Sequence, residues 1–318
     1  MVHRRAFLAA TTAFIVRGAA PMTSKDRVNL VLQGKTPDRA PFSFWHHFHD
    51  EKLPGIKHAS ATLDYQRKFR LDLVKVMSDY PYPKGSGKQW YELKEVQSPF
   101  PEQLSALELI RDGLAGQKYF VETVFNPWNQ ATKLSTKEEV QRLMHEKPQA
   151  LLDALEVIAK SQANHAKAAL EAGAAGIFLA IDNAQAGILT PSEYRKFSEP
   201  FDRMILAAAQ GVPLNTLHLH GERVHLDLFW KGWPASVIQY SAHGTKVPLA
   251  EARKKYAGVL MGGLDEESVV TGTKEEALAE YARAKAAAPK WICAPGCSVP
   301  DDSTDANQLR LSKVLMSA

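Results

Sequence analysis

Three side chains in this sequence, His218, His220 and Cys297, are of types that could bind one metal ion. The two histidines fall at the end of an apolar run, 213–219, and Gly221 follows them. Residues two apart on an extended strand point to the same side, so both imidazoles can face one point. Cys297 lies in the turn PGCSVP at 295–300. Two imidazoles and one thiolate are a ligand set that zinc accepts, and three protein ligands leave a fourth position open for catalysis.

Other interpretations of these histidines and cysteines stay open at this point. The spacing of the two strand histidines also suits side chains that simply form hydrogen bonds. Cys293 fits a buried strand residue better than a metal ligand. His46, His47 and His49 fit a solvated loop, from which one member could reach a substrate.

The elements that must position these groups are eight short runs of β-branched and aromatic residues, separated by segments with apolar residues at helical spacing. The runs are 41–45, 73–77, 118–124, 176–181, 213–219, 236–240, 258–262 and 291–294. The clearest helical segments are 148–172, 191–209, 248–256 and 274–287. Strands that alternate with helices form a parallel sheet. Eight such units predict an α/β fold, a closed (β/α)8 TIM barrel, which we expect residues 22–318 to form as a single domain.

Polar residues follow most of the predicted strands. In barrels of this kind the chemistry takes place at the carboxyl ends of the strands, so these residues are expected around the active-site cavity. They are His46, His47, Asp79, Tyr80, Asn126, Asp182, Asn183, Glu222 and His243.

The composition excludes several classes of protein. Of the 318 residues 45% are hydrophobic and 23% are charged, as in an ordinary globular protein. Two cysteines cannot build a disulfide framework, which points to a reducing compartment or to a thiol with a chemical role. We find no apolar stretch near the roughly 18 residues of a membrane span. We also find no basic stripe with interleaved aromatics, so a nucleic-acid partner is not expected.

Residues 1–21 are a separate question. Arg4, Arg5 and Arg17 supply three of the four net positive charges of the chain, and a short apolar run follows the first pair. This layout is typical of a twin-arginine export signal. The alternative is a start set too early, because Thr23 or Ser24 just after Met22 can cap a helix that ends before Gly34. We expect a cytoplasmic protein, with the periplasm as the location that a true signal would imply.

From Met22 onward the sequence resembles the uroporphyrinogen decarboxylase superfamily, and within it the branch of methylcobamide:thiol (coenzyme M) methyltransferases. The resemblance implies a (β/α)8 barrel. The segments that carry it are RVNLVLQGKTPDRAPFSFW, DLVKVMSDY, AGAAGIFLAIDNAQAGILTPSEYRKFSEPFD, TLHLHGE, VLMGGLDEESVVTGTKEEALAE and ICAPGCSVPDDSTDANQLRL.

This chain departs from both branches of the superfamily. The decarboxylases carry an arginine-bearing RQAGR segment after the first strand, where this chain has HHFHD at 46–50. Asp79 nevertheless falls where the decarboxylases keep their essential aspartate. The methyltransferases hold zinc with H-x-C and a later cysteine, and here His220 stands in place of the middle thiolate. Zinc held by one cysteine and two histidines is more positive, and acidifies a bound thiol or water more strongly, than zinc held by two cysteines and one histidine.

The resemblance therefore implies a zinc-dependent methyltransferase that moves a methyl group between a corrinoid, presented by a separate corrinoid protein, and a thiol or similar small acceptor. His218, His220 and Cys297 would hold the metal, and Asp79 and Glu222 would act in catalysis. Glu222 could instead orient His220 or join the ligands. Two alternatives remain, a metal-independent decarboxylase centred on Asp79 and a non-catalytic barrel that binds a small ligand. The sequence gives no indication of the oligomeric state.

Overall fold

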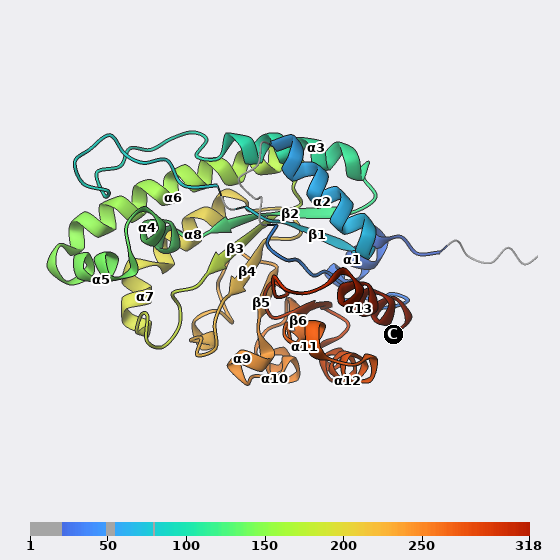
Figure 1. Cartoon of the computed structure of the whole chain (residues 1–318). Coiled ribbons are helices and arrows are strands. Elements are labelled where there is room, and N and C mark those ends of the chain that lie inside the picture. Colours follow the sequence, from blue (N-terminus) through green and yellow to red (C-terminus); the bar gives the residue numbers. More distant parts are fainter. Residues whose placement is uncertain (1–20, 49–54, 79) are drawn as a thin grey trace, which may run out of the picture.

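The computed structural model describes residues 21–48, 55–78 and 80–318. Seven parallel strands form one curled sheet and lie in chain order across it, with helices over its outer face (Figure 1). The strands are β1 (Leu73–Val76), β2 (Tyr119–Phe125), β3 (Ile177–Ile181), β4 (Thr216–Leu219), β5 (Val237–Tyr240), β6 (Val259–Leu264) and β7 (Trp291–Pro295). Each lies within or overlaps a run that the sequence predicts as a strand.

Helices connect the strands, as the alternating pattern predicts. They are α1 (Ser24–Leu32), α2 (Gly55–Phe69), α3 (Pro101–Leu114), α4 (Pro127–Leu134), α5 (Lys137–Glu146), α6 (Pro148–Glu171), α7 (Pro191–Phe197), α8 (Glu199–Ala208), α9 (Ala242–Thr245), α10 (Leu249–Lys255), α11 (Ser268–Thr271), α12 (Lys274–Ala284) and α13 (Asp305–Ser317), with 3-10 turns at Leu226–Leu228 and Lys285–Ala287. Thr23, Thr190 and Thr273 each open a helix with a capping box. In the part of the chain that the structure describes, no helix has both the length and the apolar character needed to cross a membrane.

One predicted helix, 191–209, is two helices in the structure. Ser198 ends α7 and precedes α8, with a backbone conformation that is not helical. Pro200 is the second residue of α8. Its ring removes a backbone donor and crowds the preceding turn, so the ladder of α7 cannot continue through it.

The predicted first strand, 41–45, is a single bridge rather than a strand. Phe42 pairs with Cys293 of β7, and the Ser43 N–H donates to the Cys293 carbonyl at 3.0 Å. On the other side the Asp72 N–H donates to the Phe42 carbonyl at 3.0 Å. The N–H of Phe42, however, donates to the Asp72 carboxylate at 3.1 Å. A side chain thus takes the place of a β1 carbonyl, and a regular ladder does not form.

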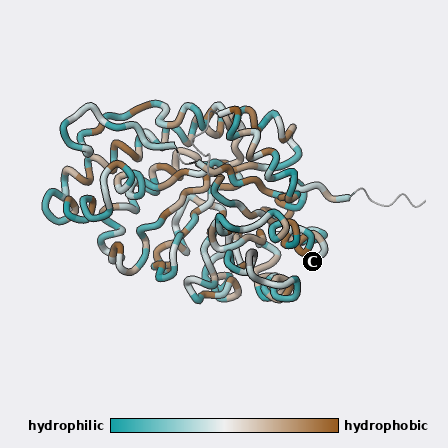
Figure 2. The backbone as a smooth tube through the Cα atoms, viewed as in Figure 1, coloured by the Kyte–Doolittle hydropathy of each residue, from teal (hydrophilic) through white to brown (hydrophobic). Residues whose placement is uncertain are grey.

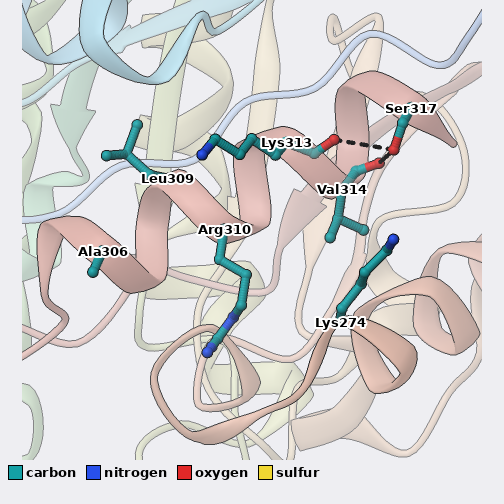
Figure 3. Close-up of a pocket in the computed structure, with 7 residues that line it drawn as sticks. All are labelled: Lys274, Ala306, Leu309, Arg310, Lys313, Val314 and Ser317. Atoms are coloured by element: carbon teal, nitrogen blue, oxygen red, sulfur yellow. Dashed lines mark hydrogen bonds between the residues drawn. The ribbon is translucent and has the colours of Figure 1, made fainter.

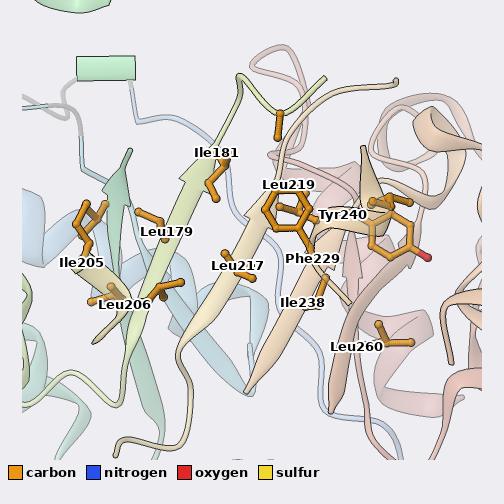
Figure 4. Packing of buried hydrophobic residues seen from close by; sticks show 14 of the residues in the cluster. Leu179, Ile181, Ile205, Leu206, Leu217, Leu219, Phe229, Ile238, Tyr240 and Leu260 are labelled. Carbon is orange, nitrogen blue, oxygen red and sulfur yellow. The ribbon is translucent and has the colours of Figure 1, made fainter. Parts of the chain in front are cut away.

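Successive side chains of each strand point alternately to the outer face of the sheet, which the helices cover, and to its inner face. On β4, Leu217 and Leu219 belong to the same buried outer cluster as Leu179 of β3 and the helix residues Ile205 and Leu206 (Figure 4). His218, between them, therefore points to the inner face. The strands are predominantly hydrophobic and the outer loops hydrophilic (Figure 2). The inner face is mostly apolar as well, so each polar group on it is conspicuous.

Candidate metal centre

The structure brings His218, His220 and Cys297 together at the inner face of the sheet. His218 is buried near the end of β4, His220 follows two residues later and is exposed, and Cys297 is half-buried in the turn after β7. Cys297 Sγ is 4.0 Å from His218 Nε2 and 3.4 Å from His220 Nδ1. All three ligand atoms lie within 4.8 Å of one another.

These distances fit a tetrahedral zinc ion. Zn–S and Zn–N bonds of about 2.3 and 2.0–2.1 Å, at tetrahedral angles, place sulfur and nitrogen ligand atoms roughly 3.6 Å apart. The two observed sulfur–nitrogen distances fall on either side of this value. The donor set of two imidazole nitrogens and one thiol sulfur also matches zinc chemistry, so the residues present fit the metal.

The electrostatics of the cluster favour a thiolate at Cys297. Burial alone raises the pKa of this thiol, but hydrogen bonds and charge from His218 and His220 outweigh burial and lower the pKa to about 4. The hydrogen bond to Cys297 in turn raises the pKa of His220. Cys293 behaves in the opposite way, because burial within β7 raises the pKa of its thiol. A thiolate is the form that binds metal, so Cys297 is prepared for that role and Cys293 is not.

A cavity of about 200 Å³ opens beside the three ligands. Its lining combines aromatic walls with a few polar groups. The lining residues are Trp45, His47, Lys75, Met77, Thr123, Phe125, Asn129, Phe178, Ala180, Asp182, His218, His220, Cys297 and Ser298. The volume suits a small molecule or part of a larger one.

A larger groove of about 590 Å³ lies elsewhere, between α12 and α13 (Figure 3). Its lining residues are Lys274, Ala306, Leu309, Arg310, Lys313, Val314 and Ser317. These residues give it a basic and apolar character without a thiol, imidazole or carboxylate. It therefore lacks the groups for metal binding or acid–base chemistry, and the smaller cavity is the candidate site.

Lys75 is a cavity residue that the sequence reasoning missed. It lies on β1 with its Nζ 5.3 Å from the ring centre of Trp45 and 5.0 Å from that of Phe178. Burial lowers the pKa of this amine to about 7, while the charges of Cys297 and Glu122 act in the opposite direction. Among the described residues, no carboxylate forms a salt bridge with it. The signal in the sequence was a charged residue at an inward position of an otherwise apolar strand, LVKV.

Asp182, one of the predicted substrate-binding residues, does line the cavity. Its Oδ2 accepts a hydrogen bond of 2.6 Å from Asn129 Nδ2. Its Oδ1 is buried and accepts no hydrogen bond from the described part of the chain. Asn129, the residue that fixes this carboxylate, was not predicted as a site residue.

Asn126 and Asn183, predicted as substrate-binding residues, are buried in a structural network and do not line the cavity. Asn126 Nδ2 donates to Asn183 Oδ1 at 2.8 Å, and Asn183 Nδ2 donates to Ser198 Oγ at 2.9 Å. Ser198 and Tyr194 donate in turn to Asp202 Oδ2. The network joins the ends of β2 and β3 to α7 and α8. Satisfying these amides inside the protein leaves them unable to face a substrate.

The other predicted residues are spread around the site. His47 lines the cavity, whereas His46 packs against Tyr65 with ring centres 4.8 Å apart. Tyr80 lies beside His58. Glu222 is exposed and outside the ligand cluster. Asp79 and His49 lie outside the described residues.

His243 belongs to a different cluster, at the ends of β5 and β6. Its Nε2 is 3.6 Å from Oε1 of Glu280, and Asp265 completes a group of three ligand-type side chains. Glu280 Oε2 already accepts hydrogen bonds from the Asp265 N–H and the Ser268 hydroxyl. His243 does not line the cavity beside Cys297.

The amino-acid sequence of this chain is similar to those of known proteins. The sequence model of uroporphyrinogen decarboxylase (URO-D) matches residues 59–315. A protein named uroporphyrinogen decarboxylase from Idiomarina loihiensis is 28% identical over 51% of this chain and 47% of its own length. One of the same name from Tolumonas auensis is 24% identical over 70% of this chain and 72% of its own length.

The fold has a counterpart among solved structures. A methyltransferase from Methanosarcina mazei superimposes with a TM-score of 0.76 over 93% of this chain and 99% of its own, at 16% sequence identity. At this identity the likeness concerns the fold. The match of the family model over residues 59–315 shows that the chain belongs to the uroporphyrinogen decarboxylase family of enzymes.

Proposed function

We propose that this chain is a zinc-dependent methyltransferase, which moves a methyl group between a corrinoid and a thiol or similar acceptor. His218, His220 and Cys297 would hold the zinc ion. The observation that carries the proposal is that their three ligand atoms lie close together at the wall of one cavity. His220 and Cys297, which take part in this cluster, are 77 residues apart in the sequence. The fold likeness to a methyltransferase agrees with this assignment.

Residues that line the cavity would have separate roles in the proposed reaction. When bound, zinc would lower the pKa of an acceptor thiol and hold the acceptor as a thiolate. Asp182, whose Oδ2 accepts a hydrogen bond from Asn129, is the one carboxylate among the described lining residues and would receive the acceptor's proton. Trp45 and Phe178 would exclude water from the acceptor, because their rings form apolar walls of the cavity.

Lys75 would select acceptors that carry a negative charge. A buried ammonium that no carboxylate of the described residues pairs with is costly, and a ligand that brings an anion removes that cost. The cavity that Lys75 lines also contains Cys297. The proposed acceptor is thus a short compound with a thiol, or a similar group, at one end and an acidic group at the other.

The methyl donor would be a methylated corrinoid carried by a separate protein, as the sequence resemblance implies. We place this reaction in the cytoplasm, with export directed by residues 1–21 as the alternative.

We further propose that residues 22–318 form a single (β/α)8 domain. In it, the segment 41–45 would be the one remaining strand of the barrel, between β7 and β1. Its hydrogen bonds to Cys293 on one side and to Asp72 on the other support this, because they place it between β7 and β1.

Metal-independent decarboxylation is the second candidate, and the names of the curated relatives favour it. Two features count against a porphyrinogen as substrate. Among the described residues, the cavity lining has one lysine and no arginine to pair with several carboxylates, and about 200 Å³ is far too small for a whole tetrapyrrole.

The test is methyl transfer by the purified, zinc-loaded protein from methylcobalamin to a panel of small thiols, with the methyl thioether measured by mass spectrometry. The proposal expects product with the wild type and Cys293→Ala, and none with Cys297→Ala. Loss of carboxyl groups from a porphyrinogen by metal-free protein, without any thioether, would favour the second candidate.

A further inference from the structure

Gln239 is a fully buried residue of β5 that contacts both parts of the proposed metal centre. Its Nε2 donates to the carbonyl of Pro295 at 2.9 Å and to that of Gly296 at 2.8 Å. Its Oε1 is hydrogen-bonded to Nδ1 of His218. One amide side chain thus links the strand that carries His218 to the turn that carries Cys297.

The chemistry of the partners fixes which way this amide faces. A backbone carbonyl can only accept a hydrogen bond, so the two carbonyls must face the NH2 group of Gln239. The amide oxygen then faces the imidazole, and because it also can only accept, Nδ1 of His218 must carry the proton. In a neutral imidazole, the other nitrogen has the free lone pair.

That second nitrogen, Nε2 of His218, is the one that faces Cys297, with 4.0 Å between nitrogen and sulfur. The ring of His218 is also held flat against Phe178, with centroids 5.0 Å apart and planes 27° apart. The orientation of the ring and the proton on Nδ1 are therefore both determined by neighbours before any metal arrives. His220 differs, since it is exposed and presents Nδ1 to the same sulfur at 3.4 Å.

We propose that Gln239 is the positioning residue of the metal centre. It keeps a proton on Nδ1 of His218, so that Nε2 is the nitrogen that binds the metal when the metal replaces its hydrogen bond to Cys297, and it anchors the Pro295–Gly296 backbone that holds Cys297 at the correct distance. This inference rests on the proposed metal binding by His218, His220 and Cys297, but its first consequence, the proton on Nδ1 of His218, is a property of the metal-free protein.

The experiment compares four proteins: wild type, Gln239→Met, Gln239→Glu and Gln103→Met. Gln239→Met removes both the acceptor and the donor, whereas Gln239→Glu keeps an acceptor oxygen for His218. Gln103 is the matched control. It too is fully buried and donates through Nε2 to the Met77 carbonyl at 3.0 Å and to Glu122 at 2.8 Å, but it does not line the cavity.

The first readout is the tautomer of His218 in metal-free protein, by nitrogen-15 NMR of labelled histidine, assigned with His218→Gln. We expect Nδ1 of His218 to be protonated in the wild type, Gln239→Glu and Gln103→Met, with or without a second proton on Nε2 toward Cys297, and to be only partly protonated in Gln239→Met. An unprotonated Nδ1 in the wild type overturns the inference, and this measurement needs no variant of Gln239 to fold.

The second readout is metal binding, by competition of Zn²⁺ with a chromophoric chelator and by the sulfur-to-metal absorption band of Co²⁺. Loss of a group that orients a ligand typically costs 10- to 100-fold in metal affinity, and we expect a loss of this size in Gln239→Met but not in Gln103→Met. Equal affinity and equal Co²⁺ spectra in the wild type and Gln239→Met overturn the inference alone. A wild type that binds neither metal overturns the proposed function instead.

Discussion

Sγ of Cys297 lies 3.4 Å from Nδ1 of His220, although 77 residues separate them in the chain. The contact exists because β4 and β7 end on the same side of a curled parallel sheet. It makes the thiol reactive in a way that its sequence neighbour Cys293 is not, because the two histidines stabilise the thiolate.

Alkylation of metal-free protein by iodoacetamide tests this difference. The pKa of Cys297 is lowered to about 4, so the thiolate is fully formed well below neutral pH. The rate at Cys297, followed by peptide mass spectrometry, is expected to stay flat between about pH 6 and 8. Cys293, fully buried, should stay unmodified. A rate at Cys297 that rises about tenfold per pH unit, as for an ordinary thiol with a pKa near 8.5, would be inconsistent with this account.

Replacement of Lys75 tests the proposed preference for acidic acceptors. Lys75→Met keeps an unbranched chain and removes the charge. A hydrogen bond to a charged group is worth about 1.5–3 kcal/mol, so KM for an acidic thiol should rise about tenfold or more. KM for a neutral thiol of similar size should change little, and Lys254→Met, at an exposed site, should affect neither. An equal effect of Lys75→Met on both thiols would show that Lys75 does not contact the acidic group.

The buried network around Asp202 predicts a dependence of stability on pH. Burial raises the pKa of Asp202 to about 7, against the effect of hydrogen bonds from Tyr194, Ser198 and Asn126. The folded protein therefore keeps a proton that the unfolded chain loses near pH 4, and the wild type loses stability as the pH rises from about 4 to about 7. Asp202→Asn does not titrate. Its free energy of unfolding by urea, relative to the wild type, should rise across this window and level off above it. Parallel profiles would refute the prediction.

Substitution of Asp72 is expected to lower the free energy of unfolding by a large amount. This fully buried carboxylate accepts hydrogen bonds from Arg39 and from the Phe42 N–H, and so fixes the segment 41–45 beside β1. Breaking a buried ion pair costs about 3–5 kcal/mol, which is expected for Asp72→Ala in urea unfolding. Asp64→Ala is the control. It removes an exposed salt bridge to Arg67, which is worth about 1 kcal/mol or less. A cost near that of the control would mean that Asp72 does not hold the segment.

Much of the fold follows from local pattern. Seven of the eight predicted strands are present, because short apolar runs between amphipathic segments leave few other arrangements. The capping boxes at Thr190 and Thr273 were also readable, since each pairs a threonine with a glutamate three residues later. The exception, 41–45, depends on the side chain of Asp72, which no local pattern reveals.

The site was predicted less completely than the fold. The spacing of His218 and His220 could be read as a shared direction on one strand, and the structure places both near Cys297. Lys75 and Gln239 were missed although each is a polar residue at an inward position of a buried strand. To recognise such a residue from sequence, one must know which alternate residues of the strand face inward. Asn126 and Asn183 were predicted at the cavity but do not line it. Their amides form hydrogen bonds with other buried side chains, which the sequence around each strand end does not reveal.

The metal content of the purified protein, measured by inductively coupled plasma mass spectrometry, decides whether His218, His220 and Cys297 hold a zinc ion. We expect about one Zn²⁺ per chain in the wild type and in Cys293→Ala, and little or none in Cys297→Ala. A wild type that stays free of metal after incubation with Zn²⁺, or a Cys297→Ala variant that retains a full equivalent, would refute the proposed metal site.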